Sequence, residues 1–410
     1  MMLPLSIFVH IPFCESLCSY CACNQVVTGL QDGATAYLGY LSREIDLHTK
    51  QLHVAQVVTQ LHVGGGTPTL LSDDLLRSLM AILRRSFLLA PAGDYSIEID
   101  PRTMNAARLD LLAELGFNRL SLGVQDIDPG VQKAVNRMYP AEQVAELVAV
   151  ARQRGFASIN IDLLYGLPRQ SPDSFVHSLA QVIELRPERI TLHAYAHQPE
   201  RFKPQRRIVA AEVPSDADKA AMLTLSIAAL IKAGYVHVGM SHFALPTDTL
   251  AIAKRQGRLH HNFHGYSTQP ECDLIGLGVS AISQVGATYS QNPRTLADYY
   301  DSLEQGRLPV ERGLGLSRDD LVRRAVILSL MCHGEILYES IESAHLIDFR
   351  RYFASELVAL QALEGQGLVT LDNAGIQVSG TGGYFVQRVA MVFDRYVQTD
   401  RLRARFSRII

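Results

Sequence analysis

Short apolar runs rich in β-branched residues recur along the first half of the chain, and longer segments with helical periodicity separate them. Runs of the first kind predict strands, and the periodic segments predict amphipathic helices. The predicted strands are 6–11, 58–63, 95–100, 119–124, 158–165 and 189–196. The predicted helices are 34–51, 73–87, 104–115, 129–136, 140–154 and 171–185. This alternation is typical of an α/β fold with parallel strands, and six such units predict a complete or partial barrel.

The pattern changes after residue 210. A helix is predicted near 215–233, and a Gly- and His-rich region follows it. From Ser317, the expected cap of a helix, the chain continues as helices and one hairpin, "GLVTLDNAGIQVSG". We therefore divide the sequence into a barrel with a cysteine-rich loop, an extension of the barrel, and a mostly helical, winged-helix-like C-terminal domain. These parts are 1–210, 211–310 and 311–410.

Each predicted strand ends in a cluster of polar residues or glycines. The clusters are a cysteine run, "GGGTPT" (64–69), "EIDP" (98–101), "GVQD" (123–126), "DLLYGLP" (162–168) and "YAHQP" (195–199). Any one of them could be an ordinary turn. The carboxyl ends of parallel strands meet at one rim, where barrels carry their active sites, so six clusters at that rim predict a functional site.

Composition and charge narrow the class of protein. The 410 residues are 48% hydrophobic, so the chain can bury a large core, and the formal net charge is −3. That charge gives no support for binding nucleic acid, in spite of the predicted wing, or for binding an anionic membrane. No apolar run approaches the ~20 residues that span a bilayer, and the N-terminus lacks the basic start of a signal peptide. We expect a cytoplasmic protein with reduced thiols.

The stretch "FVHIPFCESLCSYCACNQ" contains four of the six cysteines, and these four fall within ten consecutive positions. Cys14, Cys18 and Cys21 have the spacing C-x3-C-x2-C, and Cys23 follows two residues later. A zinc site normally draws its ligands from separate segments, whereas the thiolates of one loop can surround an iron–sulfur cluster. We therefore favour a [4Fe–4S] cluster with one open iron over zinc or uncoordinated thiols. The other two cysteines are expected to be small buried apolar residues: Cys272 and Cys332.

This spacing after a first strand resembles the signature of the radical S-adenosylmethionine enzymes. A narrower resemblance extends from near residue 4 to residue 410, in order. Its segments include "LHVGGGTPT", "SIEIDPR", "GFNRLSLGVQD", "NIDLLYGLP", "NFHGYSTQ", "DLIGLGVSAIS" and the terminal "FSRII". They are similar to the bacterial oxygen-independent coproporphyrinogen III oxidases, also called coproporphyrinogen dehydrogenases. The resemblance implies a partial (β/α)6 barrel with a [4Fe–4S] cluster and S-adenosylmethionine, of which this family binds two molecules.

The resemblance also implies roles for individual residues. The cluster ligands would be Cys14, Cys18 and Cys21, while Cys23 matches a cysteine that does not bind the cluster and whose role, catalysis included, stays open. Positions matched to S-adenosylmethionine are Phe8, Gly65, Gly66, Thr67, Glu98, Gln125, Arg137 and Asp162. Positions matched to a second molecule, which the extension 211–310 would help to line, are Tyr20, Ala196 and Ile282. On their residue types alone, the glycines could form a plain turn, and Glu98 and Asp162 could be paired core residues.

The implied reaction is the oxidative decarboxylation of two propionates of coproporphyrinogen III to vinyl groups by a 5′-deoxyadenosyl radical, in haem biosynthesis. The implied partner is a low-potential electron donor such as a flavodoxin, and we expect a monomer. A substrate with four carboxylates needs local positive charge. The segment "ERFKPQRR" either supplies this positive charge or is simply a solvated loop. Its cations are Arg201, Lys203, Arg206 and Arg207.

Three positions and one terminus depart from the family pattern. Phe8 stands where a tyrosine is expected, Ser241 where an aspartate is expected, and His264 where a glutamine is expected; the chain also begins about fifty residues late. A second cofactor bound differently would suit a radical methyltransferase or another tetrapyrrole-modifying enzyme. A haem-binding or haem-trafficking protein is a third hypothesis. Its axial ligands could be His197, His242, His260, His261 and His264.

Overall fold

The computed structural model describes residues 4–27, 31–52, 56–263, 265–269 and 272–397. The chain forms two compact units, one of Met1–Gly234 with Glu271–Leu314 and one of Tyr235–Pro270 with Gly315–Ile410. The segment 211–310, expected as a single extension, is thus divided between the two units.

The first unit contains all six predicted strands, paired in parallel in the order of the chain. They are β1 (Leu5–Ile11), β4 (Val57–Gly65), β5 (Leu88–Ile99), β6 (Arg119–Gln125), β7 (Ser158–Tyr165) and β8 (Arg189–Ala194). Their carboxyl ends form one rim, as the sequence predicts. Apolar side chains that face the helices, such as Val63, Ile97 and Ile161, are fully buried.

The sheet continues on the other side of β1 with strands that the sequence pattern does not predict. β13 (Asp273–Leu277) pairs in parallel with β1, and β14 (Ile282–Val285) and β15 (Thr288–Gln291) follow as antiparallel strands. β16 (Arg312–Gly315) lies at the edge of the sheet. Because β1 lies between β13 and β4 it does not pair with β8, so the barrel stays open, as expected for a partial barrel.

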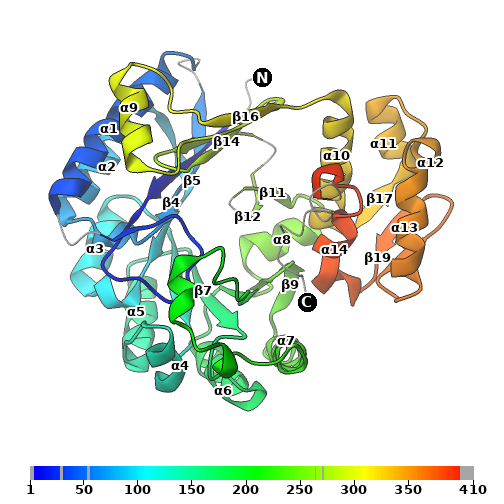
Figure 1. Ribbon diagram of the computed structural model, residues 1–410, viewed down its shortest axis with the longest axis horizontal. Coiled ribbons are helices and arrows are strands. Elements are labelled where there is room, and N and C mark those ends of the chain that lie inside the picture. Colours follow the sequence, from blue (N-terminus) through cyan, green and yellow to red (C-terminus); the bar gives the residue numbers. More distant parts are fainter. Residues whose placement is uncertain (1–3, 28–30, 53–55, 264, 270–271, 398–410) are drawn as a thin grey trace. The chain divides into compact units, whose positions relative to one another are not determined.

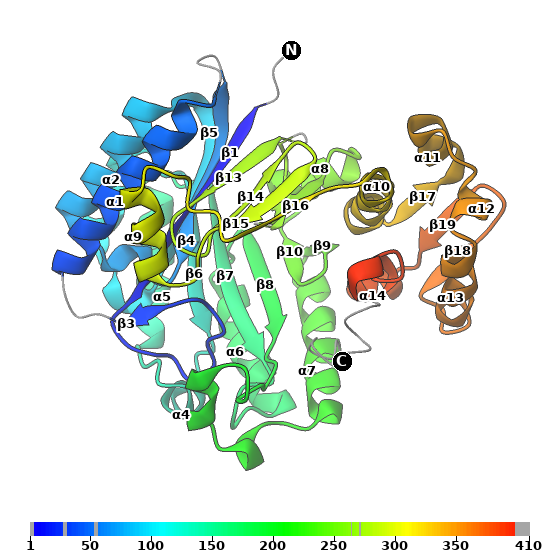
Figure 2. The same ribbon diagram turned by 45° about the horizontal axis from the view of Figure 1, so that its top comes forward.

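Helices follow the strands and line the outer side of the sheet (Figures 1 and 2). Several of them begin at a side-chain cap; for example, the side chains of Ser72, Asn105 and Ser171 each accept a backbone hydrogen bond from the first turn. The helices are α1 (Gln31–Thr49), α2 (Asp73–Ser86), α3 (Ala106–Glu114), α4 (Pro129–Ala134), α5 (Ala141–Gln153), α6 (Pro172–Glu184), α7 (Asp216–Lys232) and α9 (Leu296–Glu304). The short 3-10 turns are η1 (Pro68–Leu70), η2 (Pro101–Thr103), η3 (Lys203–Arg207) and η4 (Ala210–Glu212).

The second unit is mostly helical, with a three-stranded antiparallel wing in the order β17-β19-β18. Ser317 caps α10 as predicted, and its side chain accepts a hydrogen bond from the Asp320 N–H at 3.2 Å. The helices are α8 (Thr249–Arg255), α10 (Arg318–His333), α11 (Tyr338–His345), α12 (Phe349–Tyr352), α13 (Ala354–Glu364), η5 (Gly382–Phe385) and α14 (Val386–Ala390). The strands are β9 (Val236–Gly239), β10 (His242–Ala244), β11 (His260–Asn262), β12 (Gly265–Ser267), β17 (Glu335–Leu337), β18 (Val369–Leu371) and β19 (Gly375–Val378).

The core of this unit is apolar and includes fully buried Phe349, Phe353 and Phe393. Cys332 is buried as expected, whereas Cys272, in the first unit, is only half-buried. None of the helices in the described ranges combines the length and the apolar character that crossing a lipid bilayer requires.

Candidate active site

The cysteine-rich loop begins where β1 reaches the rim and is fixed at several points. β2 (Phe13–Cys14) pairs in parallel with β3 (Val26–Val27), which closes the base of the loop. The Ser19 N–H donates to the Val135 carbonyl at 2.9 Å, and the Asn136 amide donates to the Leu17 carbonyl at 3.0 Å. The loop is therefore anchored on the segment that follows β6.

The three predicted ligands differ in burial and in the donors around their sulfur atoms. Cys14 and Cys18 are buried, Cys21 is half-buried and Cys23 is exposed. The Thr67 hydroxyl lies 3.7 Å from the Cys14 sulfur, and the Cys23 N–H lies 3.4 Å from the Cys21 sulfur. The Cys18 sulfur has two guanidinium donors, the Nη1 of Arg137 at 3.6 Å and the Nη2 of Arg102 at 3.8 Å.

These surroundings change how readily the thiols ionise. Burial raises the pKa of Cys14 to about 11. The pKa of Cys21 falls to about 7, chiefly because the thiol of Cys23 donates a hydrogen bond to it. The same hydrogen bond raises the pKa of Cys23 well above its ordinary value. A metal ligand must be deprotonated, and the thiol of Cys21 loses its proton at a lower pH than the thiols of Cys14 and Cys23.

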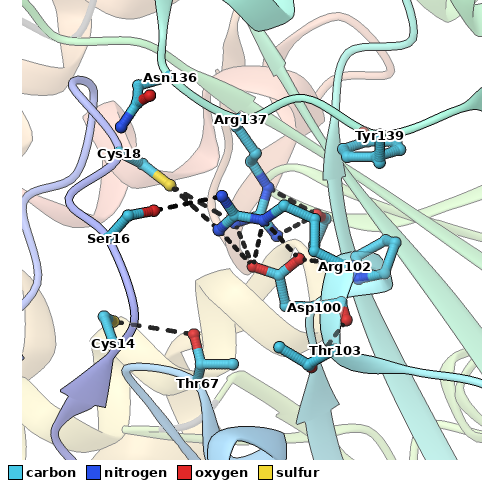
Figure 3. Close-up of polar contacts among 12 residues, drawn as sticks. Cys14, Ser16, Cys18, Thr67, Asp100, Arg102, Thr103, Asn136, Arg137 and Tyr139 are labelled. Atoms are coloured by element: carbon cyan, nitrogen blue, oxygen red, sulfur yellow. Dashed lines mark hydrogen bonds and ion pairs between the residues drawn. The ribbon is translucent and has the colours of Figure 1, made fainter. Parts of the chain in front are cut away.

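Arg137 and Arg102 share a buried carboxylate, Asp100 (Figure 3). The Oδ2 atom of Asp100 lies 2.8 Å from Nη1 of Arg137 and 2.7 Å from Nη2 of Arg102. Burial would raise the pKa of Asp100, but the hydrogen bonds of Arg102 and the charges of both arginines hold it below its ordinary value. Arg137 also donates through Nε to the Gly123 carbonyl at 3.1 Å. Each of the three guanidinium nitrogens of Arg137 thus has a partner beside Cys18.

The glycines at the end of β4 are required by their own neighbours. A Cβ on Gly64 would lie 2.7 Å from the carboxyl carbon of Glu98, and a Cβ on Gly66 would lie 2.6 Å from the Phe13 carbonyl oxygen. The Gly65 N–H donates to Glu98 at 2.9 Å, and the Gly66 N–H donates to the Ile11 carbonyl at 2.8 Å. The Thr67 N–H is similarly engaged by Phe13. These N–H donors therefore have partners within the protein, whereas a backbone carbonyl oxygen can accept a second hydrogen bond, for example from an ammonium group.

Glu98 projects from β5 with 41% of its side chain exposed. Hydrogen bonds from neighbouring groups stabilise its negative charge. Its Oε1 atom lies 3.2 Å from Nε2 of His62, and the other ring nitrogen of His62 lies 2.7 Å from the Ser96 hydroxyl. Partial burial opposes ionisation, but the hydrogen bonds from His62 and Gly65 outweigh it and lower the pKa of Glu98. Phe8 stacks on His62 with ring centroids 5.8 Å apart. The result is an accessible carboxylate at the rim.

Asp162 lies within β7, and Gln125 is the last residue of β6. Asp162 accepts hydrogen bonds from the Ser121 hydroxyl at 2.7 Å and the Asn160 amide at 2.8 Å, while burial raises its pKa. Gln125 ends β6 with φ 69°, in the left-handed region that a residue with a side chain rarely adopts. Strained positions of this kind cluster at functional sites.

The three residues matched to a second cofactor come from separate parts of the first unit. Tyr20 lies in the cysteine loop, and its carbonyl accepts a hydrogen bond from Gln205 at 3.1 Å. Ala196 is exposed beyond β8, and Ile282 is half-buried at the start of β14. The cations of the "ERFKPQRR" segment are exposed on and before η3: Arg201, Lys203, Arg206 and Arg207.

Within the described ranges, no group of three or more His, Cys, Asp and Glu side chains converges on a position for a single metal ion. A cubane cluster needs a different arrangement, because each thiolate binds its own iron. The charge of the site suits such a cluster, which becomes anionic once three thiolates bind it. Two guanidinium groups face one of the predicted ligands, and only one carboxylate lies between them. The donor set therefore fits a [4Fe–4S] cluster.

Comparisons with known proteins agree with this geometry. Residues 8–182 match the model of the radical SAM superfamily, and residues 316–385 match that of the HemN C-terminal domain. The chain is 51% identical over 409 residues to the oxygen-independent coproporphyrinogen III oxidase of Pseudomonas aeruginosa, covering 99% of this chain and 89% of the relative. The chain belongs to the family of oxygen-independent coproporphyrinogen III oxidases. The corresponding Escherichia coli protein is 45% identical over 407 residues.

A solved structure supports the same membership of this oxidase family. The coproporphyrinogen III oxidase of Escherichia coli, described as a radical SAM enzyme, superposes with a TM-score of 0.94 at 46% identity. The match covers 96% of this chain and 91% of that chain. The predicted fold, a partial α/β barrel followed by a mostly helical region, is thereby confirmed. Radical SAM proteins use a [4Fe–4S] cluster and S-adenosylmethionine, so the predicted cofactors are confirmed too.

The roles of three residues at this rim are not predicted by the sequence. Asp100 and Arg102 lie in "EIDPR", a few positions beyond Glu98, but their spacing does not reveal that Arg102 reaches Cys18 or that Asp100 joins it to Arg137. His62 lies inside a predicted strand, where it looks like an ordinary half-buried residue. Of the departures from the family pattern, Ser241 lies between β9 and β10 in the second unit, and His264 lies outside the described residues.

Proposed function

We propose that this chain is an oxygen-independent coproporphyrinogen III oxidase that acts in haem biosynthesis. It converts two propionate side chains of coproporphyrinogen III to vinyl groups and so forms protoporphyrinogen IX. Each conversion removes a hydrogen atom from the β-carbon, one CO2 and one electron, which passes to a one-electron acceptor. The proposal rests on identity to enzymes of this name along nearly the whole chain, together with a rim that carries three loop cysteines beside Arg137.

When bound, the cluster and S-adenosylmethionine supply a one-electron cleavage that yields the 5′-deoxyadenosyl radical. Cys14, Cys18 and Cys21 hold the cluster as thiolates. The accessible carboxylate of Glu98 and the backbone carbonyls at Gly65 and Gly66 accept hydrogen bonds from the amino group of the methionine moiety. These roles are supported by the lowered pKa of Glu98 and by the engaged N–H groups of the glycine turn.

The remaining matched positions complete the binding site. Thr67, Gln125, Arg137 and Asp162 contribute to holding the carboxylate and ribose groups, with Phe8 packed beside them. Tyr20, Ala196 and Ile282 line a second molecule of S-adenosylmethionine, with part of the segment 211–310 forming its wall. The exposed cations of η3 and the residues before it attract the substrate carboxylates.

The enzyme receives its electron from a low-potential protein such as a flavodoxin and works as a monomer in the cytoplasm. Neither nucleic acid nor a membrane takes part. The role of Cys23 is to support Cys21 by hydrogen bonding, without binding the cluster itself.

An anaerobic assay tests the function. Reconstituted protein is incubated with dithionite, S-adenosylmethionine and coproporphyrinogen III, and CO2 and tetrapyrrole products are measured. We expect CO2 and divinyl product from the wild type, none from Cys14→Ser, and full activity from Cys272→Ser, which removes a cysteine outside the loop. A methylated product would indicate a methyltransferase instead, and tight haem binding without turnover would indicate a haem-binding protein.

A further inference from the structure

Cys18 is surrounded by more positive charge than the other two loop cysteines. Its sulfur accepts from Nη1 of Arg137 at 3.6 Å and from Nη2 of Arg102 at 3.8 Å. Asp100 bridges both guanidinium groups, so the three side chains carry one net positive charge beside one sulfur. Cys14 and Cys21 accept instead from a hydroxyl and a backbone N–H.

Arg102 also contacts the cysteine-rich loop at a second point. Its Nη1 atom lies 3.4 Å from the Ser16 hydroxyl, between the first two cysteines, while Nε lies 3.1 Å from Oδ1 of Asp100 (Figure 3). Asp100 in turn caps η2 by accepting from the Arg102 N–H at 3.0 Å. Asp100 is 4% exposed and Arg102 is 24% exposed, so these contacts lie largely out of water, where charges act more strongly.

We propose that Arg102 is a positioning residue that fixes the Cys18 corner of the loop and, with Asp100, sets the reduction potential of the cluster. The inference rests on the proposed function. In the step concerned, an external low-potential donor gives one electron to the [4Fe–4S]2+ cluster, which becomes [4Fe–4S]1+. Hydrogen bonds to ligand sulfur and nearby positive charge favour the reduced, more negative state, and both are known determinants of such potentials.

The charges on Arg102 and Asp100 predict shifts of opposite sign. Arg102→Gln removes a positive charge and a donor at Cys18, so the reduced state loses stability and the potential becomes more negative. Asp100→Asn removes a negative charge at the same place, so the potential becomes less negative. We expect about a tenfold change in the ratio of reduced to oxidised cluster for Arg102→Gln, which corresponds to about 59 mV for one electron.

The test is an anaerobic redox titration of reconstituted protein followed by electron paramagnetic resonance, with iron and sulfide content measured for each variant. Arg77→Gln is the control, because Arg77 forms an exposed pair with Glu114 at 2.7 Å and does not contact the loop. We expect Arg102→Gln to bind its cluster and to shift the midpoint downwards, Asp100→Asn to shift it upwards, and Arg77→Gln to leave it unchanged.

Two results would overturn the inference: an unchanged midpoint in Arg102→Gln with full cluster content, or shifts of the same sign in both variants. Either can occur in an enzyme whose wild type still produces divinyl tetrapyrrole, so the proposed function would survive. A wild type that forms no cluster, in contrast, would refute the proposed function itself.

Discussion

Two carboxylates of the first unit, Asp100 and Glu44, are both almost completely buried, but their partners differ in charge. Asp100, at the rim, lies between the guanidinium groups of Arg102 and Arg137. Glu44, on α1, is fully buried and accepts from neutral donors: the Tyr299 hydroxyl at 2.6 Å, the Asn292 amide at 2.6 Å and the Gly278 N–H at 2.7 Å. The pKa of Asp100 is lowered, whereas burial raises that of Glu44 to about 7.

The comparison shows what each carboxylate does. Glu44 joins α1 to the residue after β13, to the residue after β15 and to α9, through Gly278, Asn292 and Tyr299. Tyr37 of α1 also donates to the carbonyl of His10 on β1 at 2.7 Å. Its neutral partners make it a structural acceptor that can hold a proton without losing its place. Asp100 must stay ionised, because it separates two cations that face a cluster ligand. Of these two carboxylates, the one at the rim thus carries its charge between two cations, whereas the one on α1 has uncharged donors.

The largest expected effect comes from breaking the charged network. Asp100→Ala leaves the buried guanidinium of Arg137 without its anion, so we expect the free energy of unfolding to fall by about 3–5 kcal/mol. Urea unfolding of the two proteins at equal concentration measures the difference. Glu114→Ala, which breaks the exposed pair with Arg77, should leave the unfolding midpoint nearly unchanged. Equal losses in both variants would contradict the distinction drawn here.

The dependence of stability on pH distinguishes the two carboxylates, because their shifted pKa values change the free energy of unfolding in opposite directions. Because Glu44 has a raised pKa in the folded state, the folded protein keeps this proton between pH 4.5 and about 7 while the unfolded chain releases it, so stability falls by about 3 kcal/mol as the pH rises through that window. Asp100 acts in the opposite direction: its lowered pKa contributes stability above pH 3.8 that is lost as the pH falls below that value.

Stability measured against pH for wild type and Glu44→Gln tests the first of these signs. The wild type should lose stability relative to Glu44→Gln as the pH rises from 4.5 to 7. Parallel curves for the two proteins would show that Glu44 keeps an ordinary pKa.

A smaller effect is expected from one neutral donor. Tyr299→Phe removes the hydroxyl that donates to Glu44, and we expect a loss of about 1 kcal/mol, typical of a single hydrogen bond. Thermal unfolding measures it. Tyr40→Phe, whose hydroxyl donates to Glu304 at the surface, is the matched control and should change stability less. A larger effect of Tyr40→Phe would mean that burial does not govern these contacts.

The sequence pattern predicts the part of the fold that repeats. Six strands with apolar faces and capped helices are recognisable because each element has a local signature, and their rim follows from parallel pairing. β13 was not predicted, because "DLIGLG" is short and rich in glycine and becomes a strand only by pairing with β1 across more than two hundred residues. The first half of β5, which begins at Leu88, is not predicted either, because its sequence "LLAPAG" contains a proline and a glycine.

The candidate site was predictable where residues follow a motif. The cysteines, the glycine turn and Glu98 stand at strand ends that the alternation locates. Arg102 and His62 were missed because their roles depend on the direction of a side chain in the folded unit. The same direction governs the contacts of Arg137: its motif predicts the residue as part of the site, but not that its side chain donates to Asp100, Gly123 and Cys18.

The central claim is that Cys14, Cys18 and Cys21 hold a cluster whose remaining iron binds S-adenosylmethionine. The most direct measurement is the electron paramagnetic resonance spectrum of the reconstituted, dithionite-reduced protein before and after S-adenosylmethionine is added. We predict a [4Fe–4S]1+ signal that changes when S-adenosylmethionine is added, and no such signal in Cys18→Ser. A wild-type spectrum without a cluster signal, or a signal indifferent to S-adenosylmethionine, would contradict the account.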